Sequence, residues 1–370
     1  MTFSTESQYL IHLIACAIGN ISPEEMPEHL SFEKVYEIGI KHEVANIAFY
    51  SVEKLLFQPT EELSDKWRDR RDIAISRDIN QSFARSEIVE LFSESGIEII
   101  ELQGTEIKKL YPGTEYRTMS DIDFIIKIDN LNKAKSILED LGYKCKVVDE
   151  SEVDGFRSPN ICVEIHTDYF PEYCEYHGIL PSPFDVDNVN KIDVFYAYNM
   201  LHIAKHYYGR GCGIRRVLDV YFLNKAYESI IDRKFVDSIL NKAGIFDFVS
   251  KISILADCWF SGKDTPKELK YMEEYILYSG VHGNEKILME NHLKKSFKNI
   301  RLLKTKYFFK RIFPSRVEMC QKYPKLEKCV LLYPFCCVHR FFSTIFNKKK
   351  RNIVFETAKN VLSSNPERKI

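Results

Sequence analysis

The sequence has no Cys-x-x-Cys motif, although it contains ten cysteines. Their irregular spacing excludes a zinc-binding cysteine pattern and a disulfide framework. Several of them, such as Cys16, Cys162 and Cys258, stand among apolar residues. In a reducing compartment such cysteines behave as small buried hydrophobes. The pattern predicts a cytoplasmic protein.

Signals for export and membrane insertion are also missing. The segment Met1–Gln8 is polar and lacks a basic start followed by an apolar run, so we expect no signal peptide. The longest apolar-looking stretch, 329–346, is interrupted by Pro334, His339 and Arg340. A spanning helix needs about 20 apolar residues, so we expect no transmembrane helix.

The total charge of −1 hides an acidic body and a basic tail. Residues 294–351 carry 17 Lys and Arg but only two acids, whereas residues 1–293 carry a net charge of −17. Phe and Tyr are interleaved with these basic residues, as in KYFFKRIF (306–313). Such a tail suits peripheral contact with the inner membrane face. A helix with a solvated charged face explains it equally well, and RNA binding ranks behind both.

Apolar periodicity predicts an α/β fold of the α+β kind, with a small mixed sheet embedded in mostly helical regions. In the first region, Trp67–Ser95 reads as a long helix. Its broad apolar face carries Ile75, Ile79 and Phe83 and is extended by Ile88 and Leu91. The four expected regions are a helical region (1–95), an α/β core (96–185), a second helical region (186–293) and a basic aromatic extension (294–370).

Short β-branched runs predict the strands of the core, and 3.6-residue periodicity predicts its helices. The expected strands are Ile97–Leu102, Asp121–Ile128, Tyr143–Val148 and Ile161–Thr167, and the expected helices are Glu106–Tyr111 and Asn132–Leu141.

Two carboxylates stand at the start of the second expected strand. Side chains alternate along a strand, so Asp121 and Asp123 point to the same face. Glu164 lies in another strand between two apolar residues and is the expected third carboxylate. Carboxylates held together repel one another, and a divalent cation such as Mg²⁺ relieves that repulsion. Each acid taken alone is more often a solvent-facing strand residue.

Gly104 and Thr105 stand between a strand and a helix. Glycine allows a phosphate to approach the backbone, and free N–H groups at a helix N-terminus attract it. Arg117 is placed to neutralise phosphate charge or to orient an acid. The plainer interpretations are a turn with an N-cap for Gly104 and Thr105, and a surface residue for Arg117.

Further candidates for nucleotide binding are basic. His166 shares the face of Glu164, and it is either a ligand or phosphate contact or a core histidine. His202 and His206 are one helical turn apart with Lys205 beside them, and we expect them to face the nucleotide. Zinc is not expected there, because no third ligand is evident. For Arg215 and Asp219 the spacing predicts an intrahelical ion pair, with one Arg of the Arg215-Arg216 pair reaching the triphosphate.

The runs LQGTEIKKLYPGTEYRTMSDIDFII (102–126), LEDLGY (138–143) and VEIHTDY (163–169) carry a resemblance. They resemble the nucleotidyltransferase superfamily typified by DNA polymerase beta, and within it a group of uncharacterised bacterial nucleotidyltransferases. The likeness covers most of residues 8–260. It implies NTP binding at Gly104 and Thr105, and metal ligation by Asp121, Asp123 and Glu164.

The sequence departs from that group in two places. Its usual Lys before the glycine is Gln103 here, which removes a positive charge from the mouth of the phosphate site. The interval from Thr105 to Asp121 is longer than in compact superfamily members, and this longer spacing fits the uncharacterised group.

The main hypothesis is an enzyme that uses Mg²⁺, as two ions, or Mn²⁺. It would move a nucleoside monophosphate from an NTP to an acceptor and release pyrophosphate. The acceptor classes are a sugar, a small metabolite, a lipid-linked precursor and a protein. The alternative is a catalytically degenerate nucleotide-binding or scaffolding protein at a membrane surface, which Glu164 facing away from the Asp pair would favour. A nucleic-acid modifier rests on the tail alone.

Overall fold

The chain forms two compact units. All strands and all candidate site residues lie in the larger unit, which comprises Met1–His206 and Cys212–His282; Tyr207–Gly211 and Gly283–Ile370 form the smaller one. The computed structural model describes residues 5–185, 191–281, 283 and 333–336. The predicted basic extension, 294–370, therefore lies outside the described residues except for 333–336.

Four helices precede the sheet. Thr5 and Ser31 cap the first two, because their hydroxyls accept hydrogen bonds from the backbone N–H groups of Gln8 and Lys34. The last of the four is the long helix that the sequence predicts, and it begins six residues earlier than expected. The helices are α1 (Glu6–Gly19), α2 (Phe32–Lys41), α3 (Ala45–Val52) and α4 (Glu61–Glu94).

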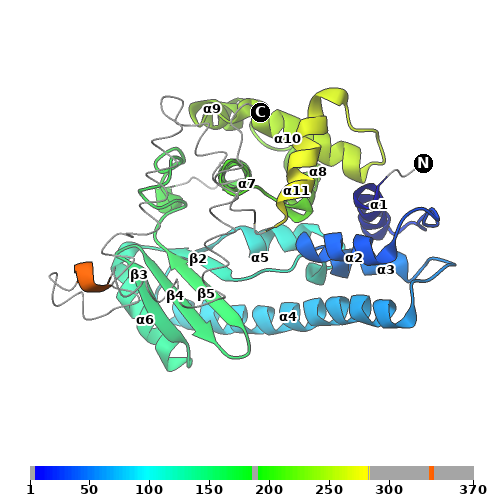
Figure 1. Cartoon of the computed structure of the whole chain (residues 1–370). Coiled ribbons are helices and arrows are strands. Elements are labelled where there is room, and N and C mark those ends of the chain that lie inside the picture. The colour runs from blue at the N-terminus through cyan, green and yellow to red at the C-terminus, as the bar shows by residue number, and fades with distance from the viewer. Residues whose placement is uncertain (1–4, 186–190, 282, 284–332, 337–370) are drawn as a thin grey trace. The chain divides into compact units, whose positions relative to one another are not determined.

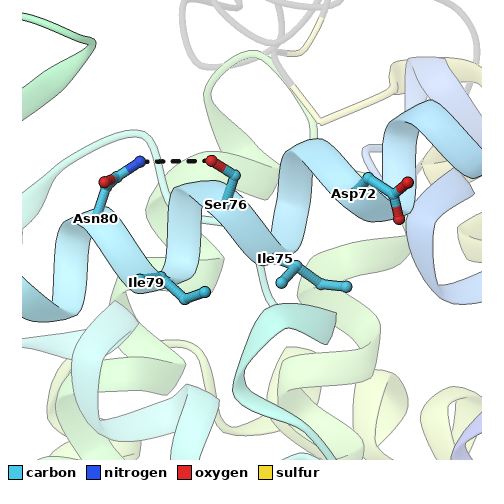
Figure 2. A pocket seen from close by; sticks show the side chains of 5 residues that line it. All are labelled: Asp72, Ile75, Ser76, Ile79 and Asn80. Atoms are coloured by element: carbon cyan, nitrogen blue, oxygen red, sulfur yellow. Dashed lines mark hydrogen bonds between the residues drawn. The ribbon is translucent and has the colours of Figure 1, made fainter.

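The predicted apolar face of α4 is wrong at Ile79 and Phe83 but confirmed at Ile88, which is fully buried. Ile79 and Phe83 are 63% and 70% exposed, and Ile75 and Ile79 line a surface pocket with polar neighbours on the same helix (Figure 2). The helix buries a different row of side chains, because one part of it packs on the sheet and another on α3. The buried residues of α4 are Leu63, Trp67, Ala74, Gln81, Ala84, Ile88 and Phe92.

The sheet has five strands in the order β1-β2-β5-β4-β3, with β2 and β5 parallel and the other neighbours antiparallel. The α+β class predicted from the sequence is confirmed. The fourth strand in chain order was not predicted. The strands are β1 (Ile99–Glu101), β2 (Ile122–Ile126), β3 (Lys144–Asp149), β4 (Glu152–Arg157) and β5 (Ile161–His166).

The two faces of this sheet differ. One face packs on α4 and on α6 (Leu131–Asp140) through buried side chains that include Phe92, Phe124 and Val163 (Figure 1). Many of the strand residues between these apolar ones, such as Asp123, Glu164 and His166, are polar and point to the opposite face, where Ile125 is a buried apolar exception. This alternation leaves a polar surface for a site and a dry surface for the core.

Among the described residues, five helices of ten or more residues follow the sheet. Several contacts tie them to the N-terminal region; for example, His42 Nδ1 accepts a hydrogen bond from the backbone N–H of Ile214, and α10 packs on α1. The helices are α7 (Lys191–Tyr208), α8 (Ile214–Tyr227), α9 (Arg233–Lys242), α10 (Phe246–Phe260) and α11 (Lys270–Ser279).

The remaining elements are short. Within the described residues, no helix combines the length and apolar character needed to cross a membrane. The short helices are α5 (Gln103–Ile107) and the 3-10 turns η1 (Lys108–Leu110), η2 (Thr114–Tyr116), η3 (Ile128–Asn130), η4 (Pro183–Asp185) and η5 (Lys267–Leu269).

Candidate active site

The carboxylates meet on the polar face of the sheet because β2 and β5 are adjacent. The parallel register places Asp123 directly beside Glu164. Asp121 precedes β2 and has the same parity as Asp123, so it belongs to the same face. The intervening Ile122 and Val163 are buried on the other face. The structure thus brings the three predicted acids together.

His166 joins these acids. Its Nε2 atom lies 3.7 Å from Asp123 Oδ1 and 3.5 Å from Glu164 Oε2. Among the described residues, Asp123, Glu164 and His166 are the group whose ligand atoms all lie within 4.8 Å of one another. Asp121 lies close enough for electrostatic repulsion but is not one of these three.

Charge crowding shifts the pKa values of this group. Burial, followed by the charges of Asp123 and Glu164, raises the pKa of Asp121 to about 7. Burial opposes a charge on His166, yet hydrogen bonds to Asp123 and Glu164 raise its pKa to about 10. Burial is the first cause of the Asp121 shift and repulsion by Asp123 and Glu164 the next, and a cation bound among these acids would relieve that repulsion. Carboxylate oxygens are donors suited to Mg²⁺ or Mn²⁺.

Strand β4 adds two acids that the sequence analysis missed. In the antiparallel register Glu152 lies opposite His166, and Asp154 lies opposite Glu164. Glu152 Oε2 is 3.9 Å from His166 Nδ1. Asp154 Oδ1 is buried without a hydrogen-bond partner among the described residues. The alternation Glu152-Val153-Asp154 was a usable strand signal, but the following Gly155 favoured a loop.

Gly104 and Thr105 lie inside the first turn of α5 rather than before the helix. Leu102 is the N-cap, and its backbone N–H donates a hydrogen bond to the backbone oxygen of Asp123 at 3.1 Å. The next N–H groups have no intrahelical acceptor, as in any first turn. A Cβ on Gly104 would lie 2.5 Å from Met119 Sδ, so this position requires glycine for packing. Thr105 Oγ1 is buried with no partner in the described part of the chain.

Arg117 is not a surface residue but half of a buried ion pair. Its Nε and Nη2 atoms donate to Asp219 Oδ1 and Oδ2 at 2.7 and 2.9 Å, and the hydroxyl of Tyr111 donates to Asp219 Oδ1 at 2.7 Å. Burial opposes ionisation of Asp219, yet the Arg117 charge and these hydrogen bonds lower its pKa. The guanidinium of Arg117 is therefore matched by a carboxylate of the protein.

Arg215 is also engaged by the protein. Its guanidinium forms an ion pair with Glu43, and its Nη1 atom donates to Thr118 O at 2.9 Å. The expected intrahelical pair is wrong, because Asp219 pairs with Arg117 instead. Arg215 and Asp219 are one turn apart on α8, but each forms its ion pair with a residue of another segment: Arg215 with Glu43 and Asp219 with Arg117.

Helix α7 presents a row of polar and aromatic side chains to the site. Gln103 Nε2 donates to the hydroxyl of Tyr198 at 3.1 Å, so the departure from the family pattern has a structural partner. His202 and His206 place their Nε2 atoms 3.2 Å apart, and burial is the main cause that lowers the pKa of both. Lys205 Nζ lies 5.9 Å from the centroid of the Phe170 ring.

A comparison with known protein families identifies the family of this chain. The model of a family described as uncharacterised nucleotidyltransferase matches residues 28–261. A comparison with curated proteins gave no match, and neither did one with solved structures. The match spans more than half of the chain and contains the sheet, the four acids of β2 and β4–β5 with His166, and helices α7 and α8. The chain therefore belongs to the uncharacterised nucleotidyltransferase family.

Proposed function

We propose that this chain transfers a nucleoside monophosphate from an NTP to an acceptor, releases pyrophosphate and depends on Mg²⁺. One observation carries the proposal: Asp123 and Glu164 stand side by side on adjacent parallel strands, with His166 between their carboxylates and Asp121 close by. A Glu164 that faced away would have favoured a protein that only binds nucleotides. Its position beside Asp123 favours the enzyme.

Asp121, Asp123 and Glu164 would hold the metal, with His166 as a further donor in the same cluster. The oxygen-rich donor set suits Mg²⁺, and Mn²⁺ also accepts an imidazole. Two ions are part of the proposal, because Glu152 and Asp154 extend the acidic face. A bound metal would neutralise phosphate charge and make the acceptor hydroxyl more acidic.

The protein residues supply position and proton transfer. The acceptor oxygen bonds to the α-phosphorus, the bond from that phosphorus to the bridging oxygen breaks, and pyrophosphate leaves. Glu164 accepts the proton of the acceptor hydroxyl. The first-turn N–H groups of Gly104 and Thr105 and the Thr105 hydroxyl bind phosphate oxygens. The buried ion pairs of Arg117 and Arg215 hold the surrounding loops in place.

Lys205, His202 and His206 are proposed to line the nucleotide-binding side of the site. All three lie on α7, whose Tyr198 hydroxyl accepts a hydrogen bond from Gln103 Nε2, next to Gly104, at 3.1 Å. The acceptor class stays a proposal among sugars, small metabolites, lipid-linked precursors and proteins. Kinship with the DNA polymerase beta superfamily, a cytoplasmic location and contact of 294–351 with a membrane are proposals of the same kind.

The test is nucleotide binding and turnover by variants of the acids. Equilibrium binding of each of the four NTPs is measured with Mg²⁺ and with EDTA for wild type, Asp123→Asn and Glu164→Gln. The matched control is Asp129→Asn, which changes an exposed acid just after β2. Pyrophosphate release is then followed with panels of sugars, metabolites and proteins.

We expect Mg²⁺-dependent NTP binding in wild type and in the control, and at least a tenfold loss in both active-site variants, about 1.4 kcal/mol. Metal-dependent binding that is unchanged in Asp123→Asn and Glu164→Gln would contradict the site. A protein that binds NTP but releases no pyrophosphate with any acceptor class would favour a nucleotide-binding role instead.

A further inference from the structure

Three arginines lie on the segments that flank the acids and on α8, and among the described residues only one of them lacks a carboxylate partner. Arg117 pairs with Asp219, and Arg215 pairs with Glu43. Arg216 forms no ion pair with any described residue, and its Nε atom is buried without a hydrogen-bond partner among them. Arg216 as a whole is only partly buried, so its guanidinium is open to a ligand, and no carboxylate of the described residues occupies it. Of the three arginines, it is therefore the one free to bind an external anion.

A neutral histidine pair holds Arg216. Its Nη1 atom lies 3.3 Å from His202 Nδ1, and a guanidinium can only donate, so His202 Nδ1 is the acceptor. A neutral His202 then carries its proton on Nε2 and donates it to His206 Nε2 at 3.2 Å. The chain of donors runs from Arg216 through His202 to His206. It fixes the guanidinium in place without supplying a negative charge.

The surroundings of Arg216 are electropositive. Arg216 lies in the first turn of α8, whose N-cap is Gly213 and whose first turn contains no acid. Cations are normally disfavoured there because the helix dipole is positive at that end. Lys205 lies within electrostatic range of both histidines of the pair and forms no ion pair with the described residues. Two cations and a helix terminus thus share one region.

This region belongs to the same site as the acids. Gln103 Nε2, next to Gly104, donates to the Tyr198 hydroxyl at 3.1 Å, and the Tyr198 ring lies 6.1 Å from the ring of His202, which holds Arg216. Tyr198, His202 and His206 follow one another at four-residue spacing and share one face of α7. A ligand that contacts metal at Asp123 and a guanidinium at Arg216 needs several anionic oxygens spread along its length. A polyphosphate has this form.

We infer that Arg216, oriented by the His202–His206 pair, binds the polyphosphate of the nucleotide, and that Arg117 and Arg215 serve structure. The inference rests on the proposed function, since it assigns the phosphate subsite of that reaction. It also names Arg216 as the member of the Arg215-Arg216 pair that contacts the triphosphate. A guanidinium offers paired N–H donors that match phosphate oxygens, which a lysine does not.

The test measures binding of inorganic tripolyphosphate to the full chain by calorimetry, in EDTA and in Mg²⁺. The variants are Arg216→Met and Arg216→Lys, and the control is Arg233→Met, an exposed arginine on α9 whose side chain is 47% exposed. Circular dichroism and thermal unfolding check that each variant folds. KM and kcat for the NTP are measured alongside wherever turnover is found.

We expect Arg216→Met to weaken tripolyphosphate binding at least tenfold, and Arg216→Lys to restore part of it because the charge returns without the paired donors. The control should bind as wild type does. In turnover, KM for the NTP should rise more than kcat falls.

Wild-type protein that does not bind tripolyphosphate, or a folded Arg216→Met or Arg216→Lys variant that binds it as wild type does, would overturn the inference. The two proposals can fail separately. Arg216-dependent tripolyphosphate binding without pyrophosphate release from any NTP sinks the proposed function and keeps the phosphate subsite. Turnover with an unchanged KM for the NTP in Arg216→Met would contradict the phosphate subsite and support the proposed function.

Discussion

The buried cluster of Arg117, Asp219 and Tyr111 leads to a strong stability prediction. Arg117 and Asp219 are joined by hydrogen bonds of 2.7 and 2.9 Å, and their side chains are 5% and 2% exposed. Asp219→Ala leaves the guanidinium buried without its counter-charge, which costs about 3–5 kcal/mol. A folded domain is stable by about 5–15 kcal/mol, so this substitution should remove a large share of the stability.

Two further variants separate the contributions. Tyr111→Phe removes one hydrogen bond to the carboxylate and keeps the ion pair, so it should cost about 1.5–3 kcal/mol. The double variant Arg117→Met/Asp219→Leu removes both charges and should be more stable than Asp219→Ala. As a control, Asp247→Ala breaks the pair with Lys251, whose side chain is 47% exposed while that of Asp247 is 81% exposed. That loss should stay below about 1 kcal/mol.

The assay is urea unfolding followed by circular dichroism at pH 7, with the slope of each transition compared between variants. An Asp219→Ala protein within about 1 kcal/mol of wild type would refute the reasoning, because the guanidinium would then find another partner or water. A double variant no more stable than Asp219→Ala would refute it too, since removing the unpaired guanidinium would then bring no gain.

Three other predictions concern packing, pH and metal. Gly104→Ala should destabilise by about 1–3 kcal/mol in urea unfolding, because its Cβ would lie 2.5 Å from Met119 Sδ; Gly19→Ala, with no heavy atom nearer than 3.8 Å, is the control and should be nearly neutral. Burial and the charges of Arg216 and Lys205 lower the pKa of His206 to about 2, so the unfolded chain binds this proton first and stability falls as the pH drops below about 6.5. The loss is up to about 1.4 kcal/mol per pH unit, and His206→Asn should show a smaller loss between pH 7 and 5.5; an identical loss would contradict the neutral pair. Mg²⁺ should raise the Tm of wild type and not of Asp123→Asn, as binding to the folded state alone requires; an equal rise in both would place the ion elsewhere.

The fold class and most core elements were predictable because they depend on local patterns. Alternation of apolar residues placed β2 and β5, and the helix at Asn132–Leu141 matches α6 within one residue at each end. The prediction failed for α4, where Ile79 and Phe83 repeat every four residues but are exposed. Periodicity shows that a helix has an apolar row, but which row is buried depends on the neighbours against which it packs.

The sequence by itself determined that Asp121 and Asp123 share a strand face, since side chains alternate along any strand. It also singled out Glu164 and His166 as members of one further face. Only the tertiary structure decided that the acids of β2 and the polar residues of β5 lie on the same face of the sheet. The pairing of β2 with β5 joins segments about 40 residues apart in sequence.

The partners of the arginines were likewise decided in three dimensions. Arg117, Arg215 and Arg216 look alike in sequence, and their ion pairs depend on which carboxylates the fold brings within reach. Asp219 and Glu43 come from α8 and from the turn after α2, and they match two of the three arginines. The unmatched charge of Arg216, which is only partly buried, is likewise a product of packing, because the fold brings no carboxylate to it.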